Sequence, residues 1–140
     1  MIRINRETDY SFRVVFALAR AGENARLPTS RIQKEMNIPR SFLYRIIASL
    51  GHNNIIKTFP GREGGVQLAR PAMEISLLDV FEAVEGPIQL SDCLSEDCSC
   101  PLDSPCPVQK SLRHVQKILN REMAAIHFDS FVPASEIRLP

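Results

Sequence analysis

The sequence predicts a mainly α-helical fold with one small β-hairpin, followed by a long C-terminal helix. Two observations carry this prediction. In the first half, three segments with the period of amphipathic helices precede two short β-prone segments that flank a Gly- and Pro-rich turn. Near the end of the 140 residues, a further periodic segment is longer than any of the others. The chain can bury one ordinary core and is too short for two large domains.

A first helix is expected over residues 8–21, before Gly22. Its apolar face consists of Phe12, Val15, Phe16 and Ala19. Thr29 or Ser30 is expected to cap a second helix, because Ser30 and Gln33 have the spacing of a capping box.

The second helix is expected to end near Met36, and a turn of Asn37, Ile38 and Pro39 leads to a third helix over residues 40–52. The apolar side of this third helix consists of Phe42, Leu43, Ile46, Ile47 and Leu50. Two short helices joined by a tight turn that contains an apolar residue predict a helix-turn-helix unit.

Residues 55–69 are expected to form a β-hairpin, because β-prone segments flank the turn PGREGG. Three helices followed by a hairpin describe a winged helix-turn-helix domain. A fourth helix is expected to end at Gly86. Its apolar residues are Ile75, Leu78, Val80, Phe81 and Val84. The winged-helix domain is therefore predicted to occupy residues 1–86.

The last helix is expected over residues 108–128. Its apolar stripe consists of Val108, Leu112, Val115, Leu119 and Ile126. A stripe of this length exceeds what a small domain can cover, so we expect residues 108–140 to form a dimerisation helix and tail. The alternative is that the helix packs back on its own domain. Residues 87–107 then form a loop between the two parts.

Charge is distributed unevenly along the chain. Residues 1–70 contain 12 Lys and Arg against 5 Asp and Glu, a net charge of +7, whereas residues 71–140 have a net charge of −6. This asymmetry predicts that the first half meets a polyanion such as double-stranded DNA. The alternative is a chance distribution of solvated surface charge.

All four cysteines lie in the segment CLSEDCSCPLDSPC, residues 93–106. The longest apolar run, VVFALA, is far below the roughly 18 residues of a membrane span, so we expect a cytoplasmic protein that does not contact the membrane. In a reducing cytosol, clustered cysteines are more typical of metal ligands or redox sensors than of structural disulfides.

Three chemistries suit such a loop. Thiolates are the usual ligands of iron-sulfur clusters. A zinc site usually has paired C-x2-4-C knuckles, whereas a single residue separates Cys98 and Cys100. A metal-free thiol switch is the third alternative. The chain has no Ser/His/Asp set, phosphate loop or paired carboxylates that we can place in one site, so we expect no enzyme. An electron-transfer subunit would leave the winged helix and the basic first half unexplained.

Several motifs together resemble a known family. They are TDYSFRVVFALA near the start, the wing exit and following helix in GREGGVQLARPAMEISLLDVFEAVEGPI, and the cysteine loop behind them. Their order and spacing resemble the winged-helix regulators that include the iron-sulfur regulator IscR, the nitric-oxide sensor NsrR and the iron regulator RirA. The resemblance covers about residues 4–128. It implies a homodimer that binds an inverted-repeat operator, most often as a repressor, with a 4Fe-4S rather than a 2Fe-2S cluster near the dimer helix.

The resemblance also implies a ligand set. In these regulators the middle ligand cysteine is often followed by Pro and separated by five residues from the last, which implies Cys93, Cys100 and Cys106 here. Cys98 is an alternative middle ligand. Asp9 of the partner subunit matches the place where nitric-oxide-sensing relatives use a fourth ligand, although it could also act only as a helix N-terminal carboxylate. His114 and His127, expected on the last helix, are the other candidates.

The geometry of a recognition helix assigns base reading to its early, outward side chains. These are Arg40, Ser41, Tyr44 and Arg45. At the tip of the wing, Arg62 is expected to enter the minor groove, since Pro60 stands where the family commonly has Arg. Phosphate contacts are expected from Arg3, Arg6, Arg31 and Lys57, any of which could instead be a solvated surface charge.

Overall fold

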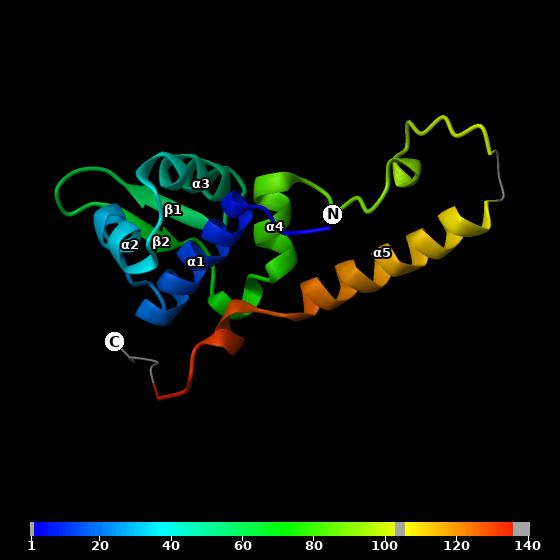
Figure 1. The fold of residues 1–140 in the computed structure, drawn as a ribbon. Helices are drawn as coiled ribbons and strands as arrows, with labels where there is room; N and C mark the ends of the chain where they lie inside the picture. Colours follow the sequence, from blue (N-terminus) through cyan, green and yellow to red (C-terminus); the bar gives the residue numbers. More distant parts are fainter. Residues whose placement is uncertain (1, 103–105, 136–140) are drawn as a thin grey trace.

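The computed structural model describes residues 2–102 and 106–135. Its main elements are α1 (Arg6–Ala21), α2 (Thr29–Met36), α3 (Arg40–His52), β1 (Ile56–Phe59), β2 (Gly65–Leu68), α4 (Leu77–Glu85) and α5 (Pro107–Ala125). Two short 3-10 helices, η1 (Ala72–Glu74) and η2 (Asp92–Leu94), lie between them, and another, η3 (Phe128–Phe131), follows α5. Figure 1 shows α1 to α4 and the hairpin as one body from which α5 extends. The predicted fold class, a mainly helical winged helix with a long last helix, is confirmed.

The N-terminal ends of α1 and α2 differ in how they are capped. The Asn5 side chain accepts a hydrogen bond from the Thr8 backbone N–H at 2.9 Å, so α1 begins at Arg6. The expected caps of α2 are wrong: Pro28 is the N-cap and no side chain caps the helix. The chain enters α2 directly from a bridge between Leu27 and Val66, which places Thr29 and its neighbour inside the first turn.

The turn between α2 and α3 is tight. Asn37 has φ of 51°, in the left-handed region that Asn tolerates, and its backbone lets α2 stop after Met36. Ile38, the apolar residue of the turn, is only 3% exposed and belongs to the core. Pro39 then precedes the first residue of α3. The helix-turn-helix unit is therefore present as the sequence predicted.

The wing is an antiparallel pair in which Ile56 lies opposite Leu68 and Phe59 opposite Gly65. Leu27 and Val66 exchange two backbone hydrogen bonds, of 2.9 and 2.8 Å, and so attach the hairpin to the segment before α2. Gly65 has φ of +143°, and a Cβ there would lie 2.4 Å from the Leu27 carbonyl oxygen. Only glycine fits at this crossing.

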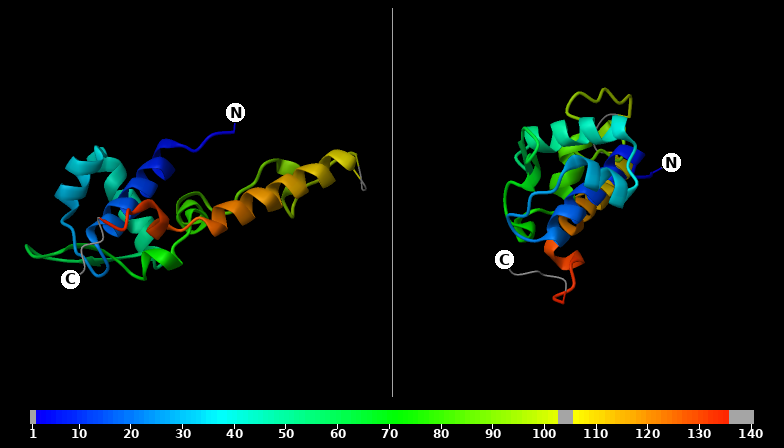
Figure 2. Two further views of the ribbon diagram at one scale, coloured as in Figure 1. Left: turned by 90° about the horizontal axis from the view of Figure 1, so that it is seen from below. Right: turned by 90° about the vertical axis from the view of Figure 1, so that its left-hand side faces the viewer.

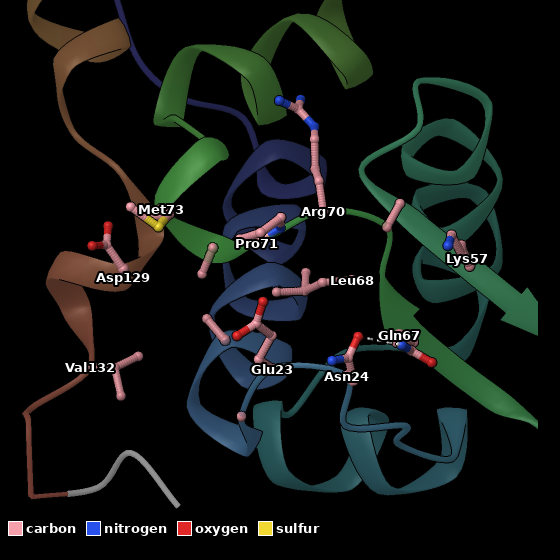
Figure 3. A pocket seen from close by; sticks show the side chains of 14 residues that line it. Glu23, Asn24, Lys57, Gln67, Leu68, Arg70, Pro71, Met73, Asp129 and Val132 are labelled. Atoms are coloured by element: carbon pink, nitrogen blue, oxygen red, sulfur yellow. Dashed lines mark hydrogen bonds between the residues drawn. The ribbon is translucent and has the colours of Figure 1, made fainter. Parts of the chain in front are cut away.

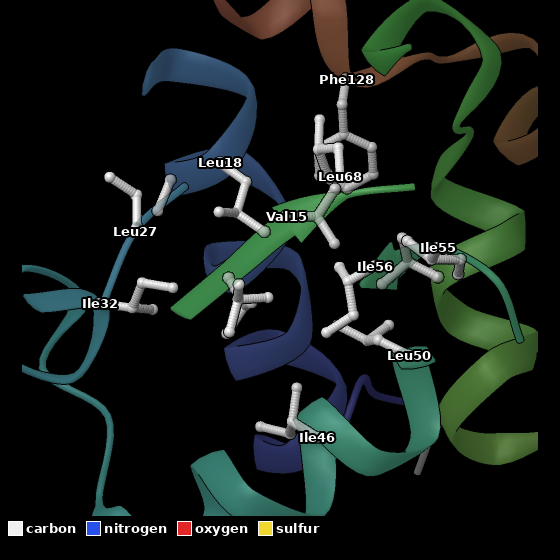
Figure 4. Packing of buried hydrophobic residues seen from close by; sticks show 14 of the residues in the cluster. Val15, Leu18, Leu27, Ile32, Ile46, Leu50, Ile55, Ile56, Leu68 and Phe128 are labelled. Atoms are coloured by element: carbon white, nitrogen blue, oxygen red, sulfur yellow. The ribbon is translucent and has the colours of Figure 1, made fainter. Parts of the chain in front are cut away.

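The core lies between α1, α2, α3, the hairpin and the segment after α5 (Figure 4). Its fully buried residues include Val15, Leu18, Ile32, Ile46, Leu50, Ile55 and Phe128. Helix α4 closes one side, with Ser76 and Asp79 forming a reciprocal capping box at its start and Gly86 ending it as expected.

The last helix ends three residues earlier than the sequence suggested. Ile126 accepts a hydrogen bond from the Leu77 N–H at 2.9 Å, and the Phe128 N–H donates to the Ile75 carbonyl at 3.0 Å. These bonds pull the chain into an extended bridge, which is incompatible with further helix. His127 therefore lies beyond α5, opposite Ser76, and not on the helix as expected.

Helix α5 extends away from the winged helix and lies beside the cysteine loop (Figure 2). None of its 19 residues is buried. Within the described part of the chain, no helix is both long and apolar enough to cross a membrane.

Candidate nucleic-acid interface and thiol-rich loop

The N-terminal half of α3 presents polar side chains to solvent. Its opposite face buries Leu43, Ile46 and Leu50 in the core. Arg40, Ser41, Tyr44 and Arg45 are all exposed. The Arg40 guanidinium donates to the Tyr44 hydroxyl at 3.3 and 3.2 Å and lies 5.5 Å from the ring centroid. The structure thus brings the four predicted base-reading residues together on one helical face, which is the arrangement that major-groove reading requires.

Arg45 also contacts the start of α1. Its guanidinium lies 5.0 Å from the Phe42 ring centroid and 3.8 Å from a Glu7 carboxylate oxygen. The Arg45 side chain is 61% exposed, so this ion pair is weak and screened by water. Arg45 can therefore exchange Glu7 for a base edge without a large loss of free energy.

Arg31 on α2 is less free than the sequence suggested. Its Nε lies 2.7 Å from a Glu35 carboxylate oxygen, and Arg20 lies 3.7 Å from the other. The hydrogen bond from Arg31 holds the pKa of Glu35 below its ordinary value, with the charges of Arg31 and Arg20 acting in the same direction against partial burial. Two arginines share one carboxylate, so a positive charge remains at this position.

The wing places its two predicted cations on different surfaces. Arg62 is exposed in the turn, beside the start of α2. Lys57 is exposed on β1, opposite Gln67, and lines a cavity near the end of α1. Strand alternation separates Lys57 from its neighbour Thr58, which faces the α2 side with Arg62.

Arg26 is a basic residue that sequence reasoning missed. Its guanidinium stacks on the Phe59 ring at 3.5 Å from the centroid, and it donates to the Glu63 carbonyl at 3.5 Å. Arg26 therefore braces the wing from the segment before α2. Nothing local indicated this role, because the contact joins residues 37 positions apart.

Two further predicted phosphate contacts lie at the start of the chain. Arg3 is exposed in the segment before α1, and Arg6 is exposed at the first position of that helix. Within the described part of the chain, neither Arg3 nor Arg6 forms an ion pair with a carboxylate. Both are available for a polyanion near the start of α1.

The cysteine loop is held against α5 by two glutamines. Gln109 donates to the Cys93 carbonyl at 2.5 Å, and Gln116 accepts from the Leu90 N–H at 3.0 Å. The Ser91 hydroxyl lies 3.2 Å from the Cys93 sulfur. These contacts fix the first part of the loop on one side of the helix. At the other end, Cys106 is the N-cap of α5.

All four cysteines are free and half-buried. Burial raises the pKa of the Cys98 thiol, and the nearby Cys100, Cys93 and Asp92 raise it further. Among residues 2–102 and 106–135, no group of three or more His, Cys, Asp or Glu side chains is arranged to hold a metal ion. The cysteines are nevertheless the type of ligand that iron-sulfur clusters use, since they are free thiols on one loop between two helices. The loop would have to close for its thiolates to ligate together.

Asp9 lies in the first turn of α1, and its carboxylate pairs with Arg13 at 2.6 Å. Its side chain is half exposed beside an apolar groove that includes Phe12, Phe16 and Phe131. Among the described residues, Asp9 forms no metal-binding group with the cysteines of its own chain. His114 is exposed on α5.

One face of α5 is apolar and exposed. Val108, Val115 and Ile118 are 65%, 51% and 38% exposed, whereas the glutamine side of the helix contacts the loop. Exposed apolar surface of this extent on a long helix is typical of an interface.

A helix-turn-helix with an exposed polar recognition helix, a braced wing and a basic first half defines a winged-helix DNA-binding protein. Comparison with known proteins identifies the family. The chain belongs to the Rrf2 family, whose model is described as an iron-dependent transcriptional regulator and matches residues 4–134. It is therefore a DNA-binding transcriptional regulator.

The chain is similar to several individual proteins. Protein aau3 of Rhizobium meliloti is 30% identical over 135 residues, covering 95% of this chain and 86% of the relative. The HTH-type transcriptional regulator NsrR of Bacillus licheniformis is 29% identical, covering 89% and 82%. Among solved structures, CymR, the global cysteine regulator of B. subtilis, has a TM-score of 0.76 at 18% identity, covering 95% of this chain and 100% of that one. T. potens IscR has a TM-score of 0.68 at 22% identity, covering 93% and 86%.

Proposed function

We propose that the protein is a homodimeric repressor that binds an inverted-repeat operator and whose DNA affinity depends on an iron-sulfur cluster held by the cysteine loop. The observation that carries this proposal is the position of four free, half-buried thiols on one loop between α4 and α5, held against the helix proposed to form the dimer. The family description as an iron-dependent regulator and the resemblance to cluster-binding regulators support it. The signal would be nitric oxide, redox state or iron supply.

The proposal assigns a role to each part of the chain. Residues 1–86 bind DNA, residues 87–107 hold the cluster, and residues 108–140 include the dimerisation helix. The ligands would be Cys93, Cys100 and Cys106, with Cys98 as the alternative middle thiol. When bound, a cluster of the 4Fe-4S type supplies an iron that reacts with the signal.

The coupling between cluster and DNA would run through the first turn of α1. In the described chain Asp9 pairs with Arg13, and neighbouring Glu7 pairs with Arg45 of the recognition helix. If the partner's Asp9 is the fourth ligand, its release from Arg13 would accompany ligation and shift the start of α1. Differential contacts of this kind in two states are what allosteric coupling requires.

Anaerobic purification tests the cluster. The preparation should be brown, with roughly equal iron and sulfide contents as a cluster requires. Cys93→Ala and Cys106→Ala should abolish the colour, while Cys98→Ala, the matched control, should retain it. Colourless protein with one zinc per chain would refute the proposal. Loss of the colour in Cys98→Ala but not in Cys100→Ala would reassign the middle ligand.

A second candidate is a cluster-free regulator that switches by thiol oxidation. It requires only free thiols close together on one loop, which the four cysteines supply. The solved structures that resemble this fold include an oxidised form of Staphylococcus aureus CymR, which is 21% identical with a TM-score of 0.72. Here the anaerobic protein should be colourless, and mild oxidation should form a disulfide, detectable by mass spectrometry, together with a change in operator affinity.

A further inference from the structure

A cavity of about 350 Å³ lies on the surface of the winged helix that is remote from the cysteine loop. It is bounded by the end of α1, the outer face of the hairpin, η1 and the η3 region (Figure 3). Its volume is at the lower end of the range of about 300–1,000 Å³ that is typical of small-molecule sites. None of the roles assigned above to the recognition helix or the cysteines uses this cavity.

Much of the lining of the cavity is apolar. This apolar part includes Ala19, Leu68, Pro71, Ala72, Met73 and Val132. Leu68 is 9% exposed and continuous with the core, whereas Met73 is 65% exposed at the edge. A hydrocarbon group placed here would leave water and gain free energy in proportion to the apolar area covered.

The rim carries unmatched charge. Glu23 and Asp129 are exposed carboxylates, and Lys57 is an exposed ammonium group. Within residues 2–102 and 106–135, none of these three has an ion-pair partner within 4.0 Å. Arg70 also reaches the rim, but its guanidinium donates to the Glu74 carbonyl at 2.7 Å and lies 3.7 Å from Asp79. The two unpaired carboxylates and the one unpaired ammonium group therefore give the rim a net charge of −1.

The polar groups are arranged in order across the opening. In Figure 3, Glu23 and Asp129 lie to one side of Leu68 and Lys57 to the other. Between them, the Gln67 amide donates to the Asn24 side chain at 3.4 Å. Asn24 has φ of 62°, so a tight turn after α1 holds it in place. A ligand would meet carboxylates first, then amides, then an ammonium group.

We propose that this cavity binds a small ligand that has an apolar body and a protonated primary amine, with the amine on the side of the opening that carries Glu23 and Asp129. Apolar amino acids and the amines obtained by removing their carboxyl group share this chemistry. In an α-amino acid the carboxylate is bonded to the same carbon as the amine, so it would face Glu23 and Asp129 and not Lys57 on the far side, and the cavity therefore favours the amines. A ligand in this position would contact both wing strands and the segment that follows α5.

Isothermal titration of the full chain tests the proposal. The ligands are leucine and phenylalanine, their decarboxylated amines, and their N-acetyl derivatives, which lack the ammonium charge. We expect saturable binding of one ligand per chain for the amines, and binding at least about tenfold weaker for the amino acids, whose carboxylate the rim repels, and for the N-acetyl forms, because a lost charge-assisted hydrogen bond has this order of effect. Lys57→Gln, on the far side of the opening, should leave the binding of the amines unchanged.

Variants locate the site. Glu23→Gln, which keeps the size of the side chain, and Ala72→Leu, which fills the cavity, should each weaken binding at least about tenfold. Glu82→Gln on the exposed side of α4 is the matched control and should bind as the unaltered protein does. Circular dichroism establishes whether each variant is folded. If Ala72→Leu does not fold, Glu23→Gln alone decides the test. Absence of saturable binding for every ligand, equal binding of the N-acetyl forms, or unchanged binding in Glu23→Gln would overturn the proposal.

Discussion

At the scale of single residues, short-range geometry decides how freely each basic side chain can meet DNA. Arg45 is held by one weak ion pair at 3.8 Å, whereas Arg31 donates to Glu35 at 2.7 Å and competes with Arg20 for the same carboxylate. Arg45 and Arg31 carry the same formal charge, but they are therefore not equally free to contact DNA. The exposed, loosely held arginine on α3 is better placed to read a base than the arginine on α2.

Replacing Arg45 by Ala tests this reading. Arg45→Ala should reduce discrimination at one position per half-site by roughly 1–3 kcal/mol, because a guanidinium can donate two hydrogen bonds to guanine. Operator variants should be compared by fluorescence anisotropy at one salt concentration, with Arg121→Ala on α5 as the control. Uniform weakening on every sequence would show that Arg45 contacts phosphate.

The raised pKa of Cys98 predicts how this thiol reacts in cluster-free protein. Since burial and the neighbouring Cys100, Cys93 and Asp92 disfavour its charged form, less of it is thiolate at neutral pH than of an ordinary cysteine. Alkylation of Cys98, followed by mass spectrometry, should be slower than that of glutathione at pH 7 and should accelerate as pH rises past the pKa of glutathione. An alkylation rate equal to that of glutathione across the pH range would contradict the assignment.

At the scale of the elements, the wing depends on one close crossing between Gly65 and the segment before α2. The Cβ of an alanine at this position would lie 2.4 Å from the Leu27 carbonyl oxygen and would require a backbone conformation that L-residues disfavour. Arg26, stacked on Phe59, braces the same hairpin from outside. The wing is thus held by backbone contact and by a cation over an aromatic ring, not by a long sheet.

Two glycine substitutions should have opposite effects. Gly65→Ala should lower the free energy of unfolding by about 1–3 kcal/mol, because it strains the backbone and displaces the bridge. Gly51→Ala in α3 should raise it by about 0.5–1 kcal/mol, because a Cβ there meets no atom within 4 Å and alanine favours a helix. Urea unfolding measures both. A neutral Gly65→Ala would mean that the crossing relaxes easily.

At the scale of the whole molecule, α5 has no buried residue in the single chain, although its apolar stripe was evident in the sequence. One side of the helix holds the cysteine loop through Gln109 and Gln116. The exposed stripe with Val115 lies on a different side. The loop and the proposed dimer contact therefore use separate faces of one helix, which allows a change in the loop to be transmitted to the dimer.

Val115→Glu should dissociate the proposed dimer. A carboxylate in the middle of an apolar helix seam is desolvated without a partner, which costs several kcal/mol per dimer. Sedimentation equilibrium should show a monomer, while Lys117→Glu, which changes charge on the opposite side of α5, should leave the dimer intact. If both variants remain dimeric, another surface forms the interface.

The sequence by itself determined the helices, the helix-turn-helix, the wing and the cysteine loop, since these depend on periodicity, on Gly and Pro and on the spacing of neighbouring residues. Only the tertiary structure decided that Pro28 precedes α2, that the last helix stops at Ala125, and that Lys57 faces the cavity and not the side of Arg62. It also revealed the Arg26 brace. Each of these features depends on contacts between segments far apart along the chain, and such contacts leave no local pattern in the order of the amino acids.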